Sequence, residues 1–381
     1  MPSTSQILAD LIAFDTTSRN ANLELIQYAQ TLLERHGATC RLTYDDDKRK
    51  ANLLTTFGDA SVAGVVLSGH TDVVPVDGQD WSTNPFELTE KAGNLYGRGT
   101  ADMKGFIASA LALAPQMSAL AAKRPIHIAL SYDEEVGCIG VQRLLADLAT
   151  AFPVLPTACI IGEPTGMKPV IGHKGIMDVS CKVHGKAAHS SMTHVGVNAV
   201  ENAAEVISFL RGMAKRIAAE GPFDQNYDPP YTTVHVGTIH GGTAQNIIPH
   251  DCTFTFEFRS IAAVDPHALL AEVTDYANRE LAPEMKKRGV TEPFKFEIGC
   301  DVPGMDTPEG EDIVRLVCKL TGANDCAHVS FATEGGRFEK VGIPAIICGP
   351  GHIEQAHKPD EFVAKAQLDA CDIFLKKFLS V

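Results

Sequence analysis

The chain has 381 residues, of which 45% are hydrophobic and 21% are charged, as in an ordinary globular protein. Because this length exceeds what a single hydrophobic core usually supports, we expect two domains. The net charge of −14 works against binding to nucleic-acid phosphates or anionic lipids, so neither nucleic acid nor a membrane is an expected partner.

The start of the chain, MPSTSQILAD, lacks the basic and apolar regions of a secretory signal, and no apolar stretch is long enough to span a membrane. The ten cysteines include no C-x-x-C pair, and a chain of this length needs no disulfides in order to fold. We therefore expect a cytoplasmic protein with reduced cysteines.

Residues 1–174 alternate short apolar runs with helical stretches. AGVVLSG, IHIALS and ACIIG are the apolar runs, and MKGFIASALALA is typical of a helix. This alternation predicts an α/β domain with a mostly parallel sheet covered by helices. The same pattern returns in residues 302–381, where helices are predicted over 312–320 and 365–379 on either side of the buried run IPAIICG.

Residues 175–301, between these two parts, follow a different pattern. In VSCKVH and FTFEFR, apolar and polar residues alternate strictly, which predicts strands of a sheet with one wet face. Helices are predicted over 197–219 and 266–284, which gives the order βαββαβ of a ferredoxin-like sheet. We therefore predict that these residues form a small domain inserted into the larger one.

Charged residues follow four buried runs of the larger domain. They are His70 and Asp72 after VVLSG, Glu134 and Glu135 after IHIALSYD, Glu163 after ACIIG, and His357 after AIICGPG and a short loop. Ligands bind at the carboxyl ends of strands in open α/β sheets, so these side chains are expected to converge. Asp102, in the glycine-flanked turn GRGTADMKG, adds another carboxylate.

Nitrogen and oxygen ligands without a thiolate suit Zn²⁺, Co²⁺ or Mn²⁺. Five ligands exceed what one open catalytic zinc needs, whereas two metals bridged by a carboxylate would use them all. Taken alone, a histidine at a strand end is usually structural, and a pair such as Glu134 and Glu135 is usually part of a solvated loop. Their coincidence at buried strand ends favours a metal site, because unpaired buried charges are costly.

Specific segments in a characteristic order run over nearly the whole chain. They are SGHTDVVP, WSTNPFELTEKAGNLYGRGTADMKG, DEEVGCIG, IIGEPT, HKG, AHSS, GVNAVE, GTIHGGTAQNIIP and GPGHIEQAHKPDE. These segments resemble the dinuclear-zinc metallopeptidase and deacylase family that includes acetylornithine deacetylases, succinyl-diaminopimelate desuccinylases and aminoacylases. IIGEPT, HKG and IHGG are most similar to the acetylornithine branch, whereas the Gly-Gly-Arg of TEGGR looks more like the desuccinylase branch.

The resemblance implies hydrolysis of the amide bond of an N-acyl amino acid, with removal of the acetyl group of N2-acetylornithine as the leading expectation. It also implies two divalent metal ions as cofactors, Zn²⁺ first, with Co²⁺ able to substitute. One ion would be held by His70, Asp102 and Glu163, and the other by Asp102, Glu135 and His357. Asp72 would hydrogen-bond the second ring nitrogen of His70, and Glu134 would be the general base.

The resemblance also indicates substrate-binding residues. His189 would stabilise the oxyanion from the partner chain of a homodimer, and Asn246 would lie near the substrate. Arg259 would bind the α-carboxylate, and Arg337 could bind the carboxylate of a succinyl group. A surface histidine and an exposed arginine on a sheet face are the simpler alternatives for His189 and Arg259.

Other functions stay open at this point. The same chemistry could act on another N-acyl amino acid or a dipeptide, or the chain could be a non-catalytic metal-binding protein of the same fold. Glu134 argues against the latter, because a structural metal site needs no free base. A hydrolase with a cysteine nucleophile is disfavoured, because no cysteine follows a strand end beside a matched histidine.

Overall fold

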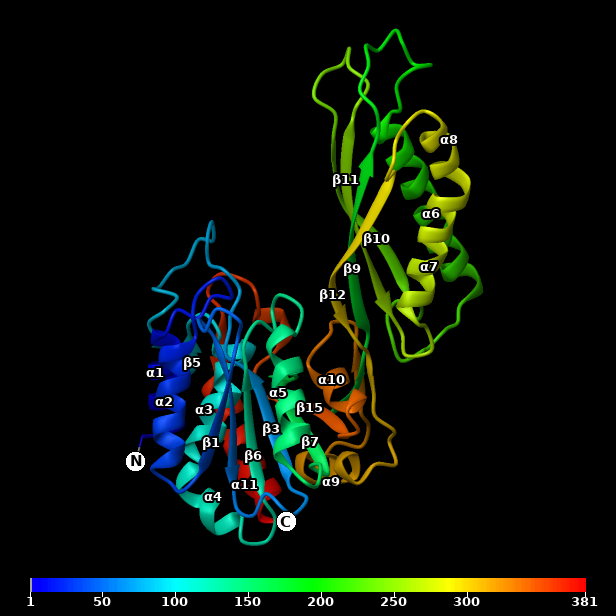
Figure 1. The fold of residues 1–381 in the computed structure, drawn as a ribbon. Helices are drawn as coiled ribbons and strands as arrows, with labels where there is room; N and C mark the ends of the chain where they lie inside the picture. The colour runs from blue at the N-terminus through cyan, green and yellow to red at the C-terminus, as the bar shows by residue number, and fades with distance from the viewer. Residues whose placement is uncertain (1) are drawn as a thin grey trace. The chain divides into compact units, whose positions relative to one another are not determined.

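The computed structural model describes residues 2–381, without the side chains of residues 149 and 151, and the chain folds into two units (Figure 1). The larger unit contains the chain up to His173, Met305–Val329 and Thr333–Val381, and the smaller unit contains Lys174–Gly304 and Ser330–Ala332. The smaller unit thus occupies residues 174–304 instead of the predicted 175–301. The difference at its end arises because its last strand continues to Val302.

A nine-stranded sheet in the order β1-β2-β6-β3-β7-β15-β8-β13, with β14 paired to β8, forms the centre of the larger unit. The strands are β1 (Thr39–Tyr44), β2 (Ala51–Phe57), β3 (Val65–His70), β6 (Ile126–Ser131), β7 (Ala158–Pro164), β8 (Val170–His173), β13 (Met305–Asp306), β14 (Ala327–Val329) and β15 (Ala345–Gly349). The central strands β6, β3, β7 and β15 run parallel, as predicted. The outer strands β1, β2 and β13 pair antiparallel with their neighbours.

Helices cover both faces of this sheet. They are α1 (Thr4–Ala13), α2 (Leu23–Glu34), α3 (Gly105–Ala112), α4 (Ala114–Leu120), α5 (Ile139–Ala151), α9 (Asp312–Thr321), α10 (Gly335–Lys340) and α11 (Lys365–Ser380). Residues of α1, α2, α3, α9 and α11 share one core with Leu67 and Ile128 of the strands. The intervening residues Val66 and Ala129 are equally buried, so the opposite face is covered too, where α5 contacts β6 and α10 contacts β15. Burial on both faces explains the continuous apolar runs of the sequence.

A second, three-stranded sheet of the larger unit joins two distant parts of the sequence. It has the order β16-β5-β4, formed by β4 (Thr89–Lys91), β5 (Asn94–Tyr96) and β16 (Phe362–Ala364). Phe362 pairs with Tyr96 in an antiparallel register. The residues that follow His357 are thereby held beside the glycine-rich turn that contains Asp102.

The smaller unit has a four-stranded antiparallel sheet in the order β10-β11-β9-β12. Its elements are β9 (Gly175–His184), α6 (Ala199–Glu220), β10 (Thr233–Gly241), β11 (Asp251–Ser260), α7 (Pro266–Tyr276), the helical turn Ala277–Leu281, α8 (Ala282–Lys287) and β12 (Phe294–Val302). Val179 and Cys181 of β9 and Phe254 and Phe256 of β11 form its core together with the helices. The predicted βαββαβ order and strand alternation are therefore confirmed.

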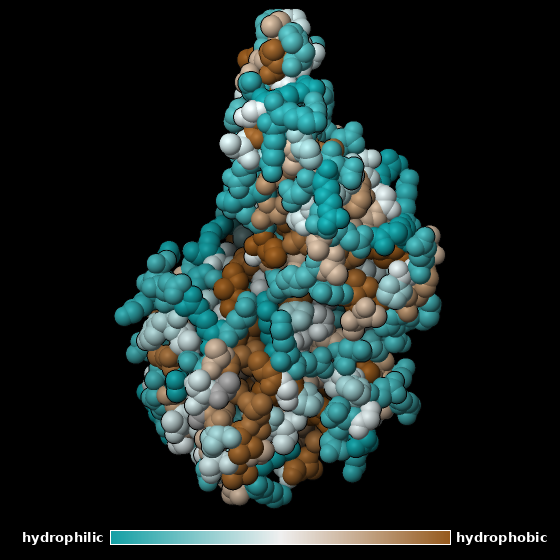
Figure 2. Space-filling model, turned by 45° about the vertical axis from the view of Figure 1, so that its right-hand side comes forward, coloured by the Kyte–Doolittle hydropathy of each residue, from teal (hydrophilic) through white to brown (hydrophobic). Residues whose placement is uncertain are grey.

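The surface drawn in Figure 2 is mostly hydrophilic, with hydrophobic side chains gathered in separate patches. Scattered apolar patches are ordinary on globular proteins. Among the described residues, none of the helices combines the length and apolar character that a membrane span requires.

Candidate metal centre

The carboxyl ends of the central parallel strands carry four of the predicted site residues. His70 is the last residue of β3 and pairs with Ser131, the last residue of β6, so the loop after β6 starts beside it. Glu134 and Glu135 lie in that loop, and Glu163 lies near the end of β7. The register of the sheet therefore brings three separate segments to one edge.

Asp102 and His357 reach the same place from outside the sheet. Asp102 lies in the irregular helical turn Thr100–Lys104, which follows Gly99 with its φ of 85°. His357 follows a short helical turn and itself has a φ of 63°. A positive φ of this kind is uncommon for a residue with a side chain and marks a backbone that its surroundings hold in place.

Asp102 lies at the centre of the site. Its Oδ1 is 3.0 Å from Nε2 of His70, and its Oδ2 is 3.3 Å from Nε2 of His357. Glu163 Oε1 is 3.6 Å from the same His70 nitrogen, and Glu135 Oε2 is 3.1 Å from the His357 nitrogen. The five predicted ligands thus meet as two groups that share one carboxylate.

Burial and charge shift the pKa of every member of this cluster. Burial raises the pKa of Glu163 well above its usual value, and that of Glu135 to about 7. Burial also opposes ionisation of Asp102, but hydrogen bonds to His357 and His70 outweigh it and lower the pKa of Asp102. Hydrogen bonds to Asp102 and Glu135 raise the pKa of His357 to about 10.

A metal ion would fit this set of donors. Glu135 Oε1 is buried and has no hydrogen-bond partner among the described residues, so this oxygen lacks the compensation that buried polar atoms normally have. The candidate ligand atoms of His70, Asp102 and Glu135 lie within 4.8 Å of one another, as do those of His70, Glu134 and Glu163. Nitrogen and carboxylate donors of this kind suit Zn²⁺ and similar divalent ions.

Asp72 supports the site differently from the prediction. The ring Nδ1 of His70 lies 2.9 Å from the backbone oxygen of Asp72, whereas the nearest carboxylate oxygen is 3.6 Å away. The carboxylate instead accepts hydrogen bonds from the backbone N–H groups of Glu134 and Glu135, at 3.0 and 3.2 Å, and from Ser18 Oγ. One residue therefore orients His70 with its carbonyl and the glutamate loop with its side chain.

The general-base candidate Glu134 has a neighbour that the sequence analysis did not identify. Cys138 is buried, and its thiol donates to Glu134 Oε1 at 3.3 Å. The backbone oxygen of Glu134 also accepts from the N–H groups of Gly137 and Cys138, each at 2.9 Å. Burial raises the pKa of the Cys138 thiol well above its usual value, so the group is a donor and not a thiolate nucleophile.

Three predicted substrate residues lie in the smaller unit, whereas all the metal-ligand candidates lie in the larger one. His189 forms an isolated β-bridge with Ile247, and the N–H of Ser190 donates to the backbone oxygen of Asn246, so the His189 and Asn246 segments lie side by side. Arg259 is half-buried, and its guanidinium lies 3.2 Å from the carboxylate of Glu257.

Arg337, the fourth, lies in α10 of the larger unit. Its charge acts on the thiol of Cys138, so it lies near the loop that carries Glu134. The preceding Glu334 is buried and accepts hydrogen bonds from the hydroxyl groups of Ser68 and Ser131 at the ends of β3 and β6. The sequence analysis noted the Thr-Glu motif but assigned no role to Glu334, because nothing in the sequence shows that its side chain points under the sheet edge.

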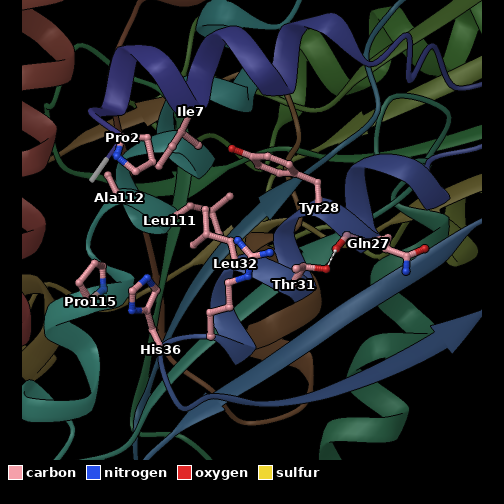
Figure 3. A pocket seen from close by; sticks show the side chains of 11 residues that line it. Pro2, Ile7, Gln27, Tyr28, Thr31, Leu32, His36, Leu111, Ala112 and Pro115 are labelled. Carbon is pink, nitrogen blue, oxygen red and sulfur yellow. Dashed lines mark hydrogen bonds between the residues drawn. The ribbon is translucent and has the colours of Figure 1, made fainter.

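The larger unit also has a separate pocket of about 440 Å³ between α1, α2 and the end of α3 (Figure 3). Ile7, Leu32, Leu111 and Pro115 give it a mainly apolar lining, and Tyr28 lies at its wall. None of its lining residues is a predicted site residue, and it brings no carboxylates together. The pocket therefore contributes nothing to the metal-binding chemistry.

Comparison with known proteins gives consistent matches. The sequence profile of peptidase family M20/M25/M40 matches residues 66–380. Acetylornithine deacetylase of Pasteurella multocida (strain Pm70) is 33% identical over 386 residues, with 100% of this chain and 98% of the relative covered. Acetylornithine deacetylase of Myxococcus xanthus is 36% identical over 387 residues, with 99% and 97% covered.

Solved structures match the fold over the same extent. The M20 family metallo-carboxypeptidase Sso-CP2 from Sulfolobus solfataricus aligns with a TM-score of 0.77 at 18% identity, covering 100% of this chain and 99% of that one. The Bacillus subtilis YXEP protein, a dinuclear metal-binding peptidase from the M20 family, aligns with a TM-score of 0.68 at 13% identity, covering 99% and 96%. At these identities the likeness concerns the fold.

The central place of Asp102 generates a prediction about metal content. Asp102→Ala should lower the bound divalent metal from about two equivalents to near zero, because both groups of ligands share this carboxylate. Glu135→Ala should retain about one equivalent, because His70, Asp102 and Glu163 are unchanged. Metal analysis after dialysis against Zn²⁺ checks both variants. The control is Asp77→Ala, because Asp77 pairs with Arg19 on the exposed surface. Retention of two equivalents by Asp102→Ala would contradict the shared role.

Proposed function

The chain belongs to peptidase family M20/M25/M40, and from this premise we propose that it removes the acetyl group of N2-acetyl-L-ornithine by metal-dependent hydrolysis, releasing ornithine and acetate. One observation carries the chemistry: two groups of nitrogen and oxygen donors share the buried Asp102, with the carboxylate of Glu134 beside them. The identity to acetylornithine deacetylases over nearly the whole chain supports the choice of substrate. Ornithine release would serve arginine biosynthesis in the cytoplasm.

We propose two divalent ions for the site, with Zn²⁺ as the native metal and Co²⁺ as a substitute. His70, Glu163 and Asp102 would hold the first, and Asp102, Glu135 and His357 the second. Bound metal would polarise the amide carbonyl and lower the pKa of the attacking water.

Glu134 would transfer the proton. Its carboxylate would accept a proton from the attacking water and then return it to the nitrogen of the leaving amine. Burial raises its pKa well above the usual value. The thiol of Cys138 donates to the carboxylate of Glu134, and the carboxylate of Asp72 accepts from the backbone N–H of Glu134, so both would keep the base oriented.

Substrate binding is assigned to residues of the smaller unit. His189 would donate to the oxyanion, and Asn246, whose segment pairs with that of His189, would contact the substrate. Arg259 would bind the α-carboxylate through its planar guanidinium, with Glu257 holding the group ready in the free protein.

Arg337 supports a second candidate, removal of a succinyl group from N-succinyl-diaminopimelate. It lies near the Glu134 loop and could bind the free carboxylate of a succinyl group, which an acetyl group lacks. Another N-acyl amino acid or a dipeptide would use the same chemistry. A non-catalytic metal-binding role is disfavoured, because it leaves the buried Glu134 without a purpose.

We also propose a homodimer in which His189 acts on the partner's metal centre. β10 is an edge strand of the smaller unit and is largely exposed, with 47% of the Ile239 surface accessible. An exposed edge strand is a ready surface for pairing with a second copy.

Glu134→Ala tests the reaction directly. Release of ornithine from N2-acetylornithine should fall by roughly 10²- to 10⁴-fold in kcat, the usual effect of losing a general base, with bound metal unchanged. Glu90→Gln, which alters an exposed ion pair with Lys365, is the control and should behave as the wild type. A near-normal rate for Glu134→Ala would contradict the assignment, and faster turnover of N-succinyl-diaminopimelate by the wild type would replace the proposed substrate.

Arg259→Lys should reduce kcat/KM for N2-acetylornithine by roughly 10- to 100-fold, because an ammonium group cannot reproduce the two parallel hydrogen bonds of a guanidinium. The same substitution should have little effect on N2-acetylornithinamide, which has no α-carboxylate. Initial rates with both substrates separate recognition from folding. An equal loss on both would assign Arg259 to the structure of the sheet.

Mixing two inactive variants tests the contribution of His189 from the partner. His189→Ala and Glu134→Ala should each be nearly inactive alone. Refolded together in equal amounts, half of the dimers are mixed and each has one complete site, so roughly a quarter of the wild-type activity should return. Mixed dimers without recovered activity would place His189 in the site of its own chain or outside catalysis.

A further inference from the structure

Three of the proposed ligands, Asp102, Glu135 and His357, lie on loops or turns and not on strands of the large sheet. His70 and Glu163 are oriented by their strands, and the carboxylate of Asp72 holds the loop of Glu135. The loops of Asp102 and His357 need other side chains to hold them. His357 also has a positive φ and a side chain that is 52% exposed. Ligands placed in this way bind metal tightly only if neighbouring groups fix their orientation.

Glu361 holds the turn that carries Asp102. Its Oε1 accepts from the backbone N–H groups of Ala101 and Asp102, at 2.9 and 3.1 Å. Its Oε2 accepts from the N–H of Gly99 at 3.0 Å and from Nη1 of Arg98 at 2.7 Å. Glu361 is buried, and both of its oxygens are therefore committed to the segment that ends at Asp102.

Arg98 and Gln79 extend this support to the loop of His357. Nη1 of Arg98 also donates to the backbone oxygen of Lys358 at 3.3 Å, and Nη2 donates to Oε1 of Gln79 at 2.6 Å. The side-chain amide of Gln79 donates in turn to the backbone oxygen of His357 at 3.1 Å. Arg98 and Gln79 thus hold the loop of His357, and Arg98 also binds Glu361, which holds the turn of Asp102.

Trp81 completes the arrangement. Its indole N–H donates to Oε1 of Gln79 at 3.0 Å, and its ring lies 5.1 Å from the guanidinium carbon of Arg98, a cation–π distance. Close by, the backbone N–H of Ser82 donates to Asp360 at 2.8 Å, and the N–H of Gly97 donates to the backbone oxygen of Glu361 at 3.0 Å. The pairing of β5 with β16 sets this register.

We propose that Gln79, Trp81, Arg98 and Glu361 form a positioning network that fixes Asp102 and His357 and thereby sets the affinity of the second metal position, the one shared by Asp102, Glu135 and His357. This inference rests on the proposed dinuclear site. A buried ion pair such as Arg98 and Glu361 is by itself weak evidence for a stabilising role. In this protein, however, Glu361 accepts from the backbone of the Asp102 segment, and Arg98 donates to the backbone of the His357 segment.

Two substitutions test the network. Glu361→Gln keeps the shape of the side chain but replaces one accepting oxygen with an NH₂ group that would face N–H donors. Arg98→Lys keeps the charge, but one ammonium group cannot reach Glu361 and Gln79 together in the planar geometry of a guanidinium. Arg143→Lys is the matched control, because Arg143 makes a similar two-bond pair with Asp46 on the surface.

The experiment is a Co²⁺ titration of the full-length, chelator-treated protein, followed by visible absorption and confirmed by metal analysis. The wild type and Arg143→Lys should bind two ions. Glu361→Gln and Arg98→Lys should bind the ion of the second position, where Asp102 and His357 are both ligands, roughly 10- to 100-fold more weakly, the usual effect of removing a group that orients metal ligands. The other ion, which shares only Asp102, should show a smaller loss. Trp81 is the only tryptophan of the chain, so its fluorescence provides a second readout at the network itself.

Circular dichroism establishes that each variant is folded. If Glu361→Gln does not fold, the question is decided by Arg98→Lys and by Trp81→Phe, which removes the indole N–H donor and part of the ring but keeps an aromatic face. A weakened second ion in either variant supports the network. Folded variants that bind both ions as tightly as the wild type would overturn the network alone. A wild type that binds no Co²⁺ would instead contradict the proposed function.

Discussion

Burial of four carboxylates at one edge of the larger sheet is the constraint on which the rest of the structure depends. Asp102, Glu134, Glu135 and Glu163 are largely removed from water around the imidazoles of His70 and His357. An isolated buried charge costs several kcal/mol. Two divalent cations would therefore compensate these carboxylates better than protons shared with the imidazoles do. The position of Asp102 between the two histidines divides the site into two halves.

The fold supplies this arrangement by two different means. Parallel strands β3, β6 and β7 end at one edge and place His70, Glu163 and the Glu134 loop there. Asp72, just after β3, holds that loop by accepting from its backbone N–H groups. Asp102 and His357 come from loops and are held by the small sheet and by Glu361. The first half of the site is therefore part of the core, whereas the second half depends on side-chain hydrogen bonds.

Much of this could be predicted from the sequence, because the information was local. Continuous apolar runs indicated buried strands, alternation in FTFEFR indicated a one-sided sheet, and the charged residues after the runs indicated where a site would form. The choice of the five ligands among them came from the family resemblance. The antiparallel edges of the large sheet were not predicted, because short outer strands have no distinct pattern. Glu361 was missed because its partner Arg98 is 263 residues away, and the thiol of Cys138 was missed because its direction depends on the fold of its loop. The Asp72 prediction identified the residue but not the atom, since a sequence does not distinguish a carbonyl from a carboxylate.

The central claim is that the buried carboxylate cluster hydrolyses N2-acetylornithine only with divalent metal bound. The most direct measurement is ornithine release by chelator-treated protein of verified metal content, repeated as Zn²⁺ is added in increments. We expect negligible turnover without metal and recovery that rises with bound Zn²⁺. Turnover of metal-free protein at the rate of the untreated enzyme would contradict the account.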